Sequence, residues 1–181
     1  LLDEPHLNRK NNEEIYADTF KLLYLGRKQR FKADPKNLEA MTAISKHLAR
    51  SQDQRGFWAH EYPNPFATAA VVNALARAKE AGAKIDEGMI KRAGDGLMST
   101  RGKNGEQAYD ADRGPSSMKD SSARVGQCEH ALLIAGKNGD VAKAFENYWK
   151  NRDKMNAVRV CDFHSDGELA GFFLYHSLFF T

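Results

Sequence analysis

Histidine side chains recur at matching places in this sequence, and two of them facing one cavity could act as acid and base. His130, His176 and Asn73 each stand two residues before a leucine. Arg124 and Glu129 belong to the same segment as His130 and could join such a group. A packing role fits the repetition better, because a catalytic group usually occurs once and a buried histidine must be hydrogen-bonded. We therefore expect both histidines to pack against neighbouring helices, with ligand binding as the alternative.

A second group combines residue types that bind zinc. Cys161, Asp162 and His164 are close in the chain, and thiolate, carboxylate and imidazole are all zinc ligands. Their spacing matches no zinc finger, while Cys128 and His130 are two residues apart and would point to different sides of a helix. Two cysteines are also too few for a disulfide framework. The sequence predicts two buried thiols and no cofactor, with a zinc site as the alternative.

The elements that must position these side chains are all predicted to be helices. Asp34 can cap a helix whose first residue is Pro35, because the N–H that proline lacks has no partner at that position. Over residues 35–51 apolar residues recur every three or four positions and charged residues lie elsewhere, which is typical of an amphipathic outer helix. Residues 66–81 are apolar on almost every side, which predicts an inner helix covered all round.

The same alternation of inner and outer helices continues along the chain, and no segment has the pattern of a strand. Further inner helices are expected over residues 12–27, from Asp120 or Ser121 to Gly136, and from about residue 165 onward. Outer helices are expected over residues 85–98 and after Asp140, where one apolar stripe joins Val141, Ala144, Phe145, Tyr148 and Trp149.

This alternation has a period of roughly 45 to 60 residues, which indicates a repeat architecture. A single hairpin of inner and outer helix cannot bury its own apolar surface, so neighbouring hairpins must stack. We therefore predict an all-α fold of helix-hairpin repeats that forms one domain over residues 1–181. The chain starts without Met and ends in an apolar run. We expect it to be a fragment of a longer chain or to associate with itself.

The segment between the first outer helix and the next inner helix carries a motif. Gln52, Gly56 and Trp58 form a Q-x3-G-x-W pattern, which precedes an alanine-rich helix beginning near Thr68. The glycine permits a tight turn, and the indole ring fills the gap between hairpins. The pattern resembles the QW repeat of squalene cyclases and their protein prenyltransferase relatives. The resemblance implies an α/α toroid, or an open arc of one, since the chain holds fewer hairpins than a closed ring.

The catalytic motifs of these enzymes and their fold relatives are incomplete here. The cyclases protonate substrate from a D-x-D-D sequence, whereas Asp110 and Asp112 are followed by Arg113. This segment is expected to be a charge-balanced loop, with a cation site as the alternative. Prenyltransferases hold zinc with Asp, Cys and His, which residues 161–164 match in type. Complement-like proteins form a thioester at C-G-E-Q, but Asn104 replaces that cysteine, which excludes thioester chemistry.

The loops that precede inner helices are expected to meet on one rim, because equivalent loops of a repeat protein share a face. Binding residues concentrate on such loops. We expect a polar mouth over an apolar cavity lined by Phe66, Tyr109, Phe172 and Phe173, with an ordinary solvated rim as the alternative. The predicted ligand-binding residues are His60, Glu61, Tyr62, Asp120, Arg124, His130, His164, Asp166 and His176.

The composition limits the kinds of partner that this chain is expected to bind. The 27 basic and 24 acidic side chains are interspersed and leave a net charge of +3, so no nucleic-acid face is predicted. No apolar run of about 18 residues is present to span a membrane. We expect a binding module that takes a hydrophobic small molecule or a protein partner in its concave face. The alternative is a fragment or divergent member of a cyclase or prenyltransferase-type enzyme.

Overall fold

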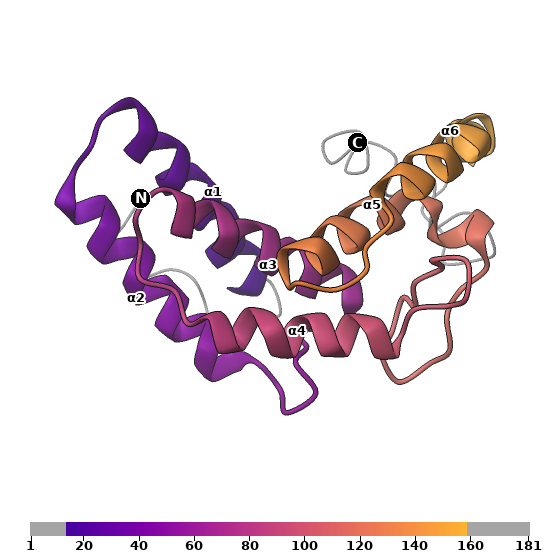
Figure 1. The fold of residues 1–181 in the computed structure, drawn as a ribbon, viewed down its shortest axis with the longest axis horizontal. Helices are drawn as coiled ribbons and strands as arrows, with labels where there is room; N and C mark the ends of the chain where they lie inside the picture. The colour runs from indigo at the N-terminus through magenta and orange to yellow at the C-terminus, as the bar shows by residue number, and fades with distance from the viewer. Residues whose placement is uncertain (1–13, 159–181) are drawn as a thin grey trace.

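The computed structural model describes residues 14–158, which form six α helices and one very short β hairpin (Figure 1). The prediction of an all-helical chain is confirmed for this part of the protein. None of these helices is long and apolar enough to cross a membrane. The elements are α1 (Glu14–Phe31), α2 (Pro35–Ser51), β1 (Ala59–His60), β2 (Tyr62–Pro63), α3 (Pro65–Glu80), α4 (Glu87–Ser99), α5 (Met118–Ile134) and α6 (Val141–Val158).

Side-chain caps fix where several helices begin. The Asp34 carboxylate accepts from the N–H of Lys36 at 2.9 Å and opens α2, as predicted. The start of α5 was predicted wrongly, because Ser117 is its cap and Asp120 lies inside the first turn. The Ser117 hydroxyl accepts from the Asp120 N–H at 3.2 Å, which is the N-cap hydrogen bond of α5.

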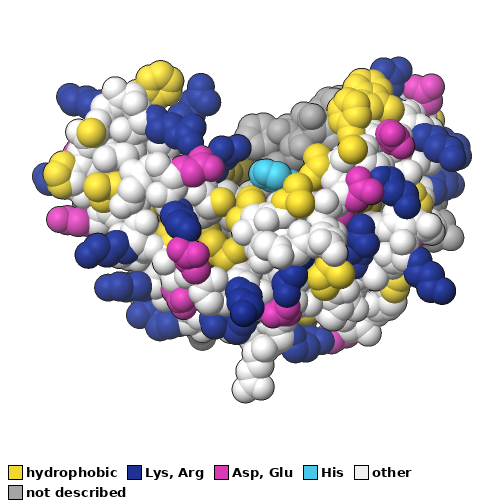
Figure 2. Space-filling model, in the orientation of Figure 1, with side chains coloured by type: hydrophobic (Ala, Val, Ile, Leu, Met, Phe, Trp, Pro, Cys, Tyr) yellow, Lys and Arg dark blue, Asp and Glu magenta, His cyan; other side chains and the backbone are white. Residues whose placement is uncertain are grey.

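Helices α1, α3 and α5 lie side by side in a row. Helix α3 contacts both α1 and α5, while α2 packs on α1, α4 packs on α3 and α5, and α6 packs on α5. The three helices of the row run in the same direction. Phe66 and Ala123, near the starts of α3 and α5, share one apolar cluster, and Gly26 lies beside Arg77 near the ends of α1 and α3. Figure 2 shows the hollow between the two ends of this row.

Helix α3 lies in the middle of the row and is buried almost completely, as its apolar composition predicts. The closest approach to α1 depends on a glycine. A Cβ at Gly26 would lie 3.5 Å from the carbonyl oxygen of Arg77, so the two backbones meet with almost no side chain between them. Helix α1 is longer than predicted and continues past Arg27 to Phe31, because Gly26 serves helix packing and does not end the helix.

The segment from Gln52 to Trp58 ties α2 to α3 and α4. The Gln52 amide donates to the carbonyl oxygens of Gly56 at 3.0 Å and Met89 at 2.9 Å, and its oxygen accepts from Arg92. The Trp58 indole is fully buried and donates to the Leu48 carbonyl at 2.8 Å, which closes the end of α2. Gln52 and Trp58 of the local pattern therefore make separate contacts at this junction.

Two short strands were not predicted. Ala59 pairs with Pro63, and His60 with Tyr62, in a hairpin whose turn residue Glu61 has a φ of 64°. The segment is too short to show the alternation that identifies a strand in a sequence. It brings His60 and Tyr62 to the start of α3, where both side chains are half-buried.

The apolar stripe predicted for α6 is only partly buried. Ala144 and Tyr148 are buried, but Val141, Phe145 and Trp149 are exposed in the described structure. Helix α6 packs mainly on α5, and Tyr148 and Met155 also join Phe66 of α3 in one apolar cluster, so the buried edge of the stripe is the one that faces these helices.

A buried ion pair holds the loop between α4 and α5. The Glu129 side chain is 1% exposed and accepts from Arg101 at 2.7 and 3.0 Å. It also accepts from the backbone N–H of Asp140 at 2.7 Å, at the start of α6. One carboxylate thus joins α5 to the loop before it and to the turn after it. The sequence placed Glu129 among possible ligand-binding groups, whereas the structure gives it a bracing role.

Candidate functional site

Side chains from three loops and helix starts meet at one rim of the molecule. The rings of Tyr16 and His60 lie 5.0 Å apart, which links the start of α1 to the hairpin. The rings of Tyr62 and Tyr109 lie 5.7 Å apart, which links the hairpin to the loop before α5. The guanidinium of Arg124 lies 5.2 Å from the centre of the Tyr109 ring. The predicted residues His60, Tyr62 and Arg124 are therefore brought to one end of the row of helices.

Arg124 and Asp120 form the buried charged part of this region. Arg124 is fully buried, and Asp120 is 6% exposed. The guanidinium donates to the Asp120 backbone carbonyl at 3.2 Å and approaches its carboxylate at 3.5 Å. Burial lowers the pKa of Arg124 from its usual value, and the Asp120 carboxylate opposes this shift. A charge removed from water in this way is costly unless it is paired and hydrogen-bonded.

Three buried polar atoms near this pair lack a hydrogen-bond partner among the described residues. They are Oδ1 of Asp120, the hydroxyl oxygen of Ser121 and the phenol oxygen of Tyr148. Asp120 and Ser121 belong to the first turns of α5, and Tyr148 reaches the region from α6. Folded proteins pair the great majority of buried polar groups, so several unpaired atoms in one region indicate that something else supplies their partners.

Aromatic and apolar side chains surround these polar atoms. Phe66, Ala123, Tyr148 and Met155 form one buried cluster, with Tyr16 and Tyr109 partly buried against it. Burial and a hydrogen bond with Tyr109 raise the pKa of the Tyr62 phenol above its usual value, so Tyr62 remains a neutral donor at physiological pH. The region combines a buried pair of opposite charges with hydroxyl groups and aromatic rings.

Other predicted binding residues do not join this group. Glu61 is exposed at the tip of the hairpin. His130 lies further along α5, where its Nδ1 is in hydrogen-bond contact with Oδ1 of Asn73 on α3. Asn73 also donates to its own helix at Ala69 and to the Gln127 carbonyl. Burial lowers the pKa of His130, which favours the neutral ring in this contact. His130 and Asn73 therefore join α5 to α3, which is the packing role predicted from the repeated pattern.

The remaining candidates lie outside the described residues. They are His164, Asp166 and His176 of the predicted rim and Cys161, Asp162 and His164 of the alternative zinc site. Within residues 14–158 no group of three or more His, Cys, Asp or Glu side chains is placed to hold a metal ion. Phe172 and Phe173, expected in the cavity wall, also lie beyond the described part of the chain.

The carboxylates of the acidic loop form ion pairs with neighbouring arginines. Asp112 accepts from Arg55 at 2.6 Å, and Asp110 lies 3.5 Å from Arg113. The charge balance predicted for this loop is therefore present. In the neighbouring turn, Glu106 accepts from the backbone and side chain of Asn104, so the residues that resemble a thioester motif stabilise a tight turn.

Ser121, Tyr148 and Tyr16 are part of this region but were not singled out from the sequence. Tyr148 belongs to the apolar stripe of α6, and nothing in that stripe distinguishes a phenol that is buried from one that reaches water. Ser121 was considered only as a helix cap. Comparison with protein families, with curated proteins and with solved structures gives no match for this chain. The function must therefore be inferred from the geometry alone.

Cys128 is a buried thiol, as predicted, and we expect it to be unreactive. Burial raises its pKa to about 12, and its sulfur lies 3.9 Å from the Pro65 carbonyl oxygen. The thiolate is the reacting species, so alkylation at pH 7.5 should be roughly a thousandfold slower than for an exposed cysteine. The measurement is mass-spectrometric labelling of a Cys161→Ser variant with iodoacetamide before and after denaturation.

The control for this experiment adds Ser51→Cys, which places a thiol at an exposed position of α2. This second thiol should be labelled completely under conditions that leave Cys128 intact. Rapid labelling of Cys128 in the folded protein would mean that α3 and α5 separate easily, in conflict with the close packing described above.

Proposed function

We propose that the chain is an open arc of an α/α toroid, related in architecture to the terpenoid cyclases and protein prenyltransferases. The support is the row of three parallel helices with a second helix packed on each of them. The segment from Gln52 to Trp58 adds to this support, since Gln52 and Gly56 contact α4 and the Trp58 N–H donates to Thr68 of α3. Such a row presents equivalent loops on one rim, where the Tyr16, His60, Tyr62 and Tyr109 rings meet.

We infer that this arc is a ligand-binding module for a hydrophobic small molecule with a polar head. The inference is carried by one observation: near the buried pair of Arg124 and Asp120, three polar atoms of Asp120, Ser121 and Tyr148 have no hydrogen-bond partner within residues 14–158. An anionic or hydroxyl head would accept from Ser121, Tyr148 or the guanidinium, and a hydroxyl head would also donate to Asp120. The apolar body would pack against Phe66 and Tyr109.

Binding is better supported than catalysis among the described residues. Asp120 and Arg124 compensate each other, and Asp110 and Asp112 are ion-paired near the surface. An acid that protonates a substrate must lie within hydrogen-bond reach of that substrate. Each of these carboxylates lies against a guanidinium group of the protein instead.

The test compares the protein with a variant in which the buried pair is neutral but of similar size, Asp120→Asn with Arg124→Met. Native mass spectrometry reports any small molecule retained on purification, and calorimetry measures the binding of palmitate and of hexadecanol as probes. We expect retained mass or measurable binding in the wild-type protein. The variant should bind palmitate at least tenfold more weakly, because about 1.4 kcal/mol of lost charge-assisted hydrogen bonding corresponds to that factor.

A matched control removes an exposed pair of the same chemistry, Arg55→Met with Asp112→Asn. This control should bind both probes as the wild-type protein does. Equal weakening in both double variants would contradict a specific site at α5. A bare protein that binds neither probe would mean that ordered water satisfies the three polar atoms, and the binding proposal would be rejected.

A further inference from the structure

The C-terminal part of α1 is basic and apolar at the same time. Residues 19–33 contain five Lys or Arg side chains and no Asp or Glu. Three aromatic side chains of this stretch are more than half exposed, namely Phe20 at 59%, Tyr24 at 55% and Phe31 at 81%. With Arg27 they lie along one line of the helix, since their spacings of three, four and seven residues return to the same face. Arg27 covers the Phe31 ring at 5.5 Å.

A pocket adjoins this face between the ends of α1 and α3. It has a volume of about 530 Å³ and is lined by Leu23, Gly26, Arg27, Arg30, Phe31 and Arg77. The absence of a side chain at Gly26 brings the two helices together and forms the pocket floor against the Arg77 backbone. Three guanidinium groups therefore surround a concavity with an aromatic ring on its edge.

The arginines of this pocket already bind a carboxylate of the protein itself. Glu80 accepts from Arg30 at 2.5 Å and from Arg77 at 2.9 Å through the same oxygen, Oε2. One carboxylate thus serves two guanidinium groups, whereas Arg27 forms no ion pair with any residue that the structure describes. The four side chains Arg27, Arg30, Arg77 and Glu80 carry a net charge of +2 from three cations and one anion. The pocket is therefore preorganised for further carboxylates.

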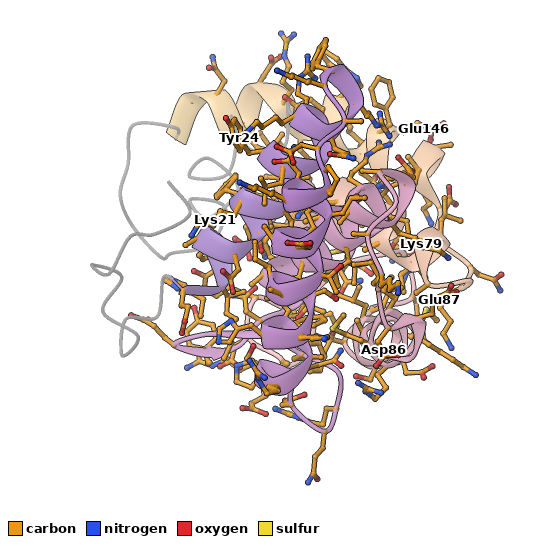
Figure 3. The ribbon with its side chains drawn as sticks, turned by 90° about the vertical axis from the view of Figure 1, so that its left-hand side faces the viewer. Lys21, Tyr24, Lys79, Asp86, Glu87 and Glu146 are labelled. Carbon is orange, nitrogen blue, oxygen red and sulfur yellow. The ribbon has the colours of Figure 1, made fainter. Side chains whose placement is uncertain are left out.

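A larger groove, which Glu80 also lines, lacks this charge imbalance. It has a volume of about 850 Å³ and lies between the ends of α3 and α5 and the start of α4. Its Lys79 is paired with Glu87 at 2.7 Å, and its Lys137 is paired with Asp95. Figure 3 shows Lys21 and Tyr24 of α1 on the opposite side of the molecule from Lys79 and Glu87. Figure 2 shows an apolar side chain flanked by basic ones at the α1 end.

We propose that the C-terminal end of α1 and the arginine pocket beside it bind an acidic polypeptide segment that carries an apolar anchor residue. The carboxylates would bind Arg27, Arg30 and Arg77, and the anchor would pack against Phe31. A flat anionic membrane could contact the exposed aromatic side chains of α1 but could not enter the pocket. Arg30 and Arg77 already bind a carboxylate in the folded protein, which favours an acidic polypeptide. This surface is separate from the ligand site at α5, so the proposal does not depend on it.

The test measures binding of a fluorescein-labelled peptide of eight glutamates around one central phenylalanine, by anisotropy at 50 mM and 150 mM salt. The full chain should bind, and more weakly at the higher salt because exposed charges are screened. Arg27→Gln with Arg30→Gln should weaken binding at least tenfold, and Phe31→Ser should weaken it several-fold. Circular dichroism should show unchanged helix content, since all three side chains are exposed.

The control variant Lys36→Gln with Arg50→Gln removes two exposed charges from α2 and should change the affinity less than twofold. Equal weakening in this control would mean that the peptide responds only to total charge, and the proposal would fail. Stronger binding of single-stranded DNA or of phosphatidylglycerol vesicles than of the peptide, lost in the α1 variant, would also overturn it and assign this face to that partner.

Discussion

Replacing Gly56 with alanine is expected to destabilise the protein by about 4 kcal/mol, which is a large part of the stability of an ordinary domain. Gly56 has a φ of 93°, where an L residue is strained by about 1 to 2 kcal/mol. A Cβ there would lie 2.1 Å from the carbonyl oxygen of Arg92, in the backbone of α4. Backbone atoms cannot move aside as a flexible side chain can, so the turn or α4 must shift.

The consequence extends beyond the turn. Gln52 bonds to the Gly56 carbonyl, to Met89 and to Arg92, so a displaced turn loses the contacts that hold α2 against α4. Thermal unfolding followed by circular dichroism should show a midpoint lowered by about 10 °C, given 2 to 4 °C per kcal/mol for a chain of this size.

Gly136 provides the matched control for Gly56. It also has a positive φ, of 72°, but a Cβ there would meet nothing within 4 Å. Gly136→Ala should therefore cost only the backbone term, about 1 kcal/mol. If both variants lose the same stability, the close approach to α4 contributes nothing, and the account given for Gly56 is wrong.

Replacing Glu129 with glutamine is expected to cost about 3 kcal/mol, because removing one partner of a buried ion pair leaves the other charge uncompensated. Both oxygens of Glu129 accept from donors, Oε1 from Arg101 and Oε2 from Arg101 and the N–H of Asp140. A glutamine must turn its NH2 group toward one of these donors, whichever way it is rotated. The measurement is urea unfolding at pH 7 with the linear extrapolation.

A double variant tests the ion pair by removing both of its charges. Arg101→Met combined with Glu129→Leu should be more stable than Glu129→Gln alone, since two apolar side chains leave no buried charge behind. The exposed pair of Lys137 and Asp95 supplies a comparison, and Asp95→Asn should change stability by less than about 1 kcal/mol. A loss for Glu129→Gln no larger than for Asp95→Asn would contradict a bracing role.

The sequence indicates the importance of Gly56 but not that of Glu129. Gly56 stands in a motif whose tight turn was predicted, and the structure adds the partner that makes the glycine necessary. Glu129 lies 28 residues from Arg101 in the chain, and no local pattern relates them. Its carboxylate was considered as a possible ligand group beside His130, although the two side chains serve different neighbours.

Local patterns determined the helices and which of them are covered. Helix α3 has apolar residues on almost every side, which predicts its burial. Caps such as Asp34 and Asn64 determine where α2 and α3 begin. These signals are local because a helix repeats every few residues and its first turn needs an acceptor nearby. The Gln52 motif is also local and predicts the junction between hairpins.

Tertiary structure alone decided which polar side chains leave water. Arg124 and Tyr148 are buried because the loop that carries Tyr109 and the last described helix close over the start of α5, whereas Arg113 and Trp149 stay exposed. Whether a charged or aromatic side chain is buried depends on segments that are distant in the chain. The hydrophobic periodicity of one helix gives no information about those segments. The sequence by itself therefore determined an all-helical chain with one candidate rim, and the packing of distant segments decided which residues of that rim could bind.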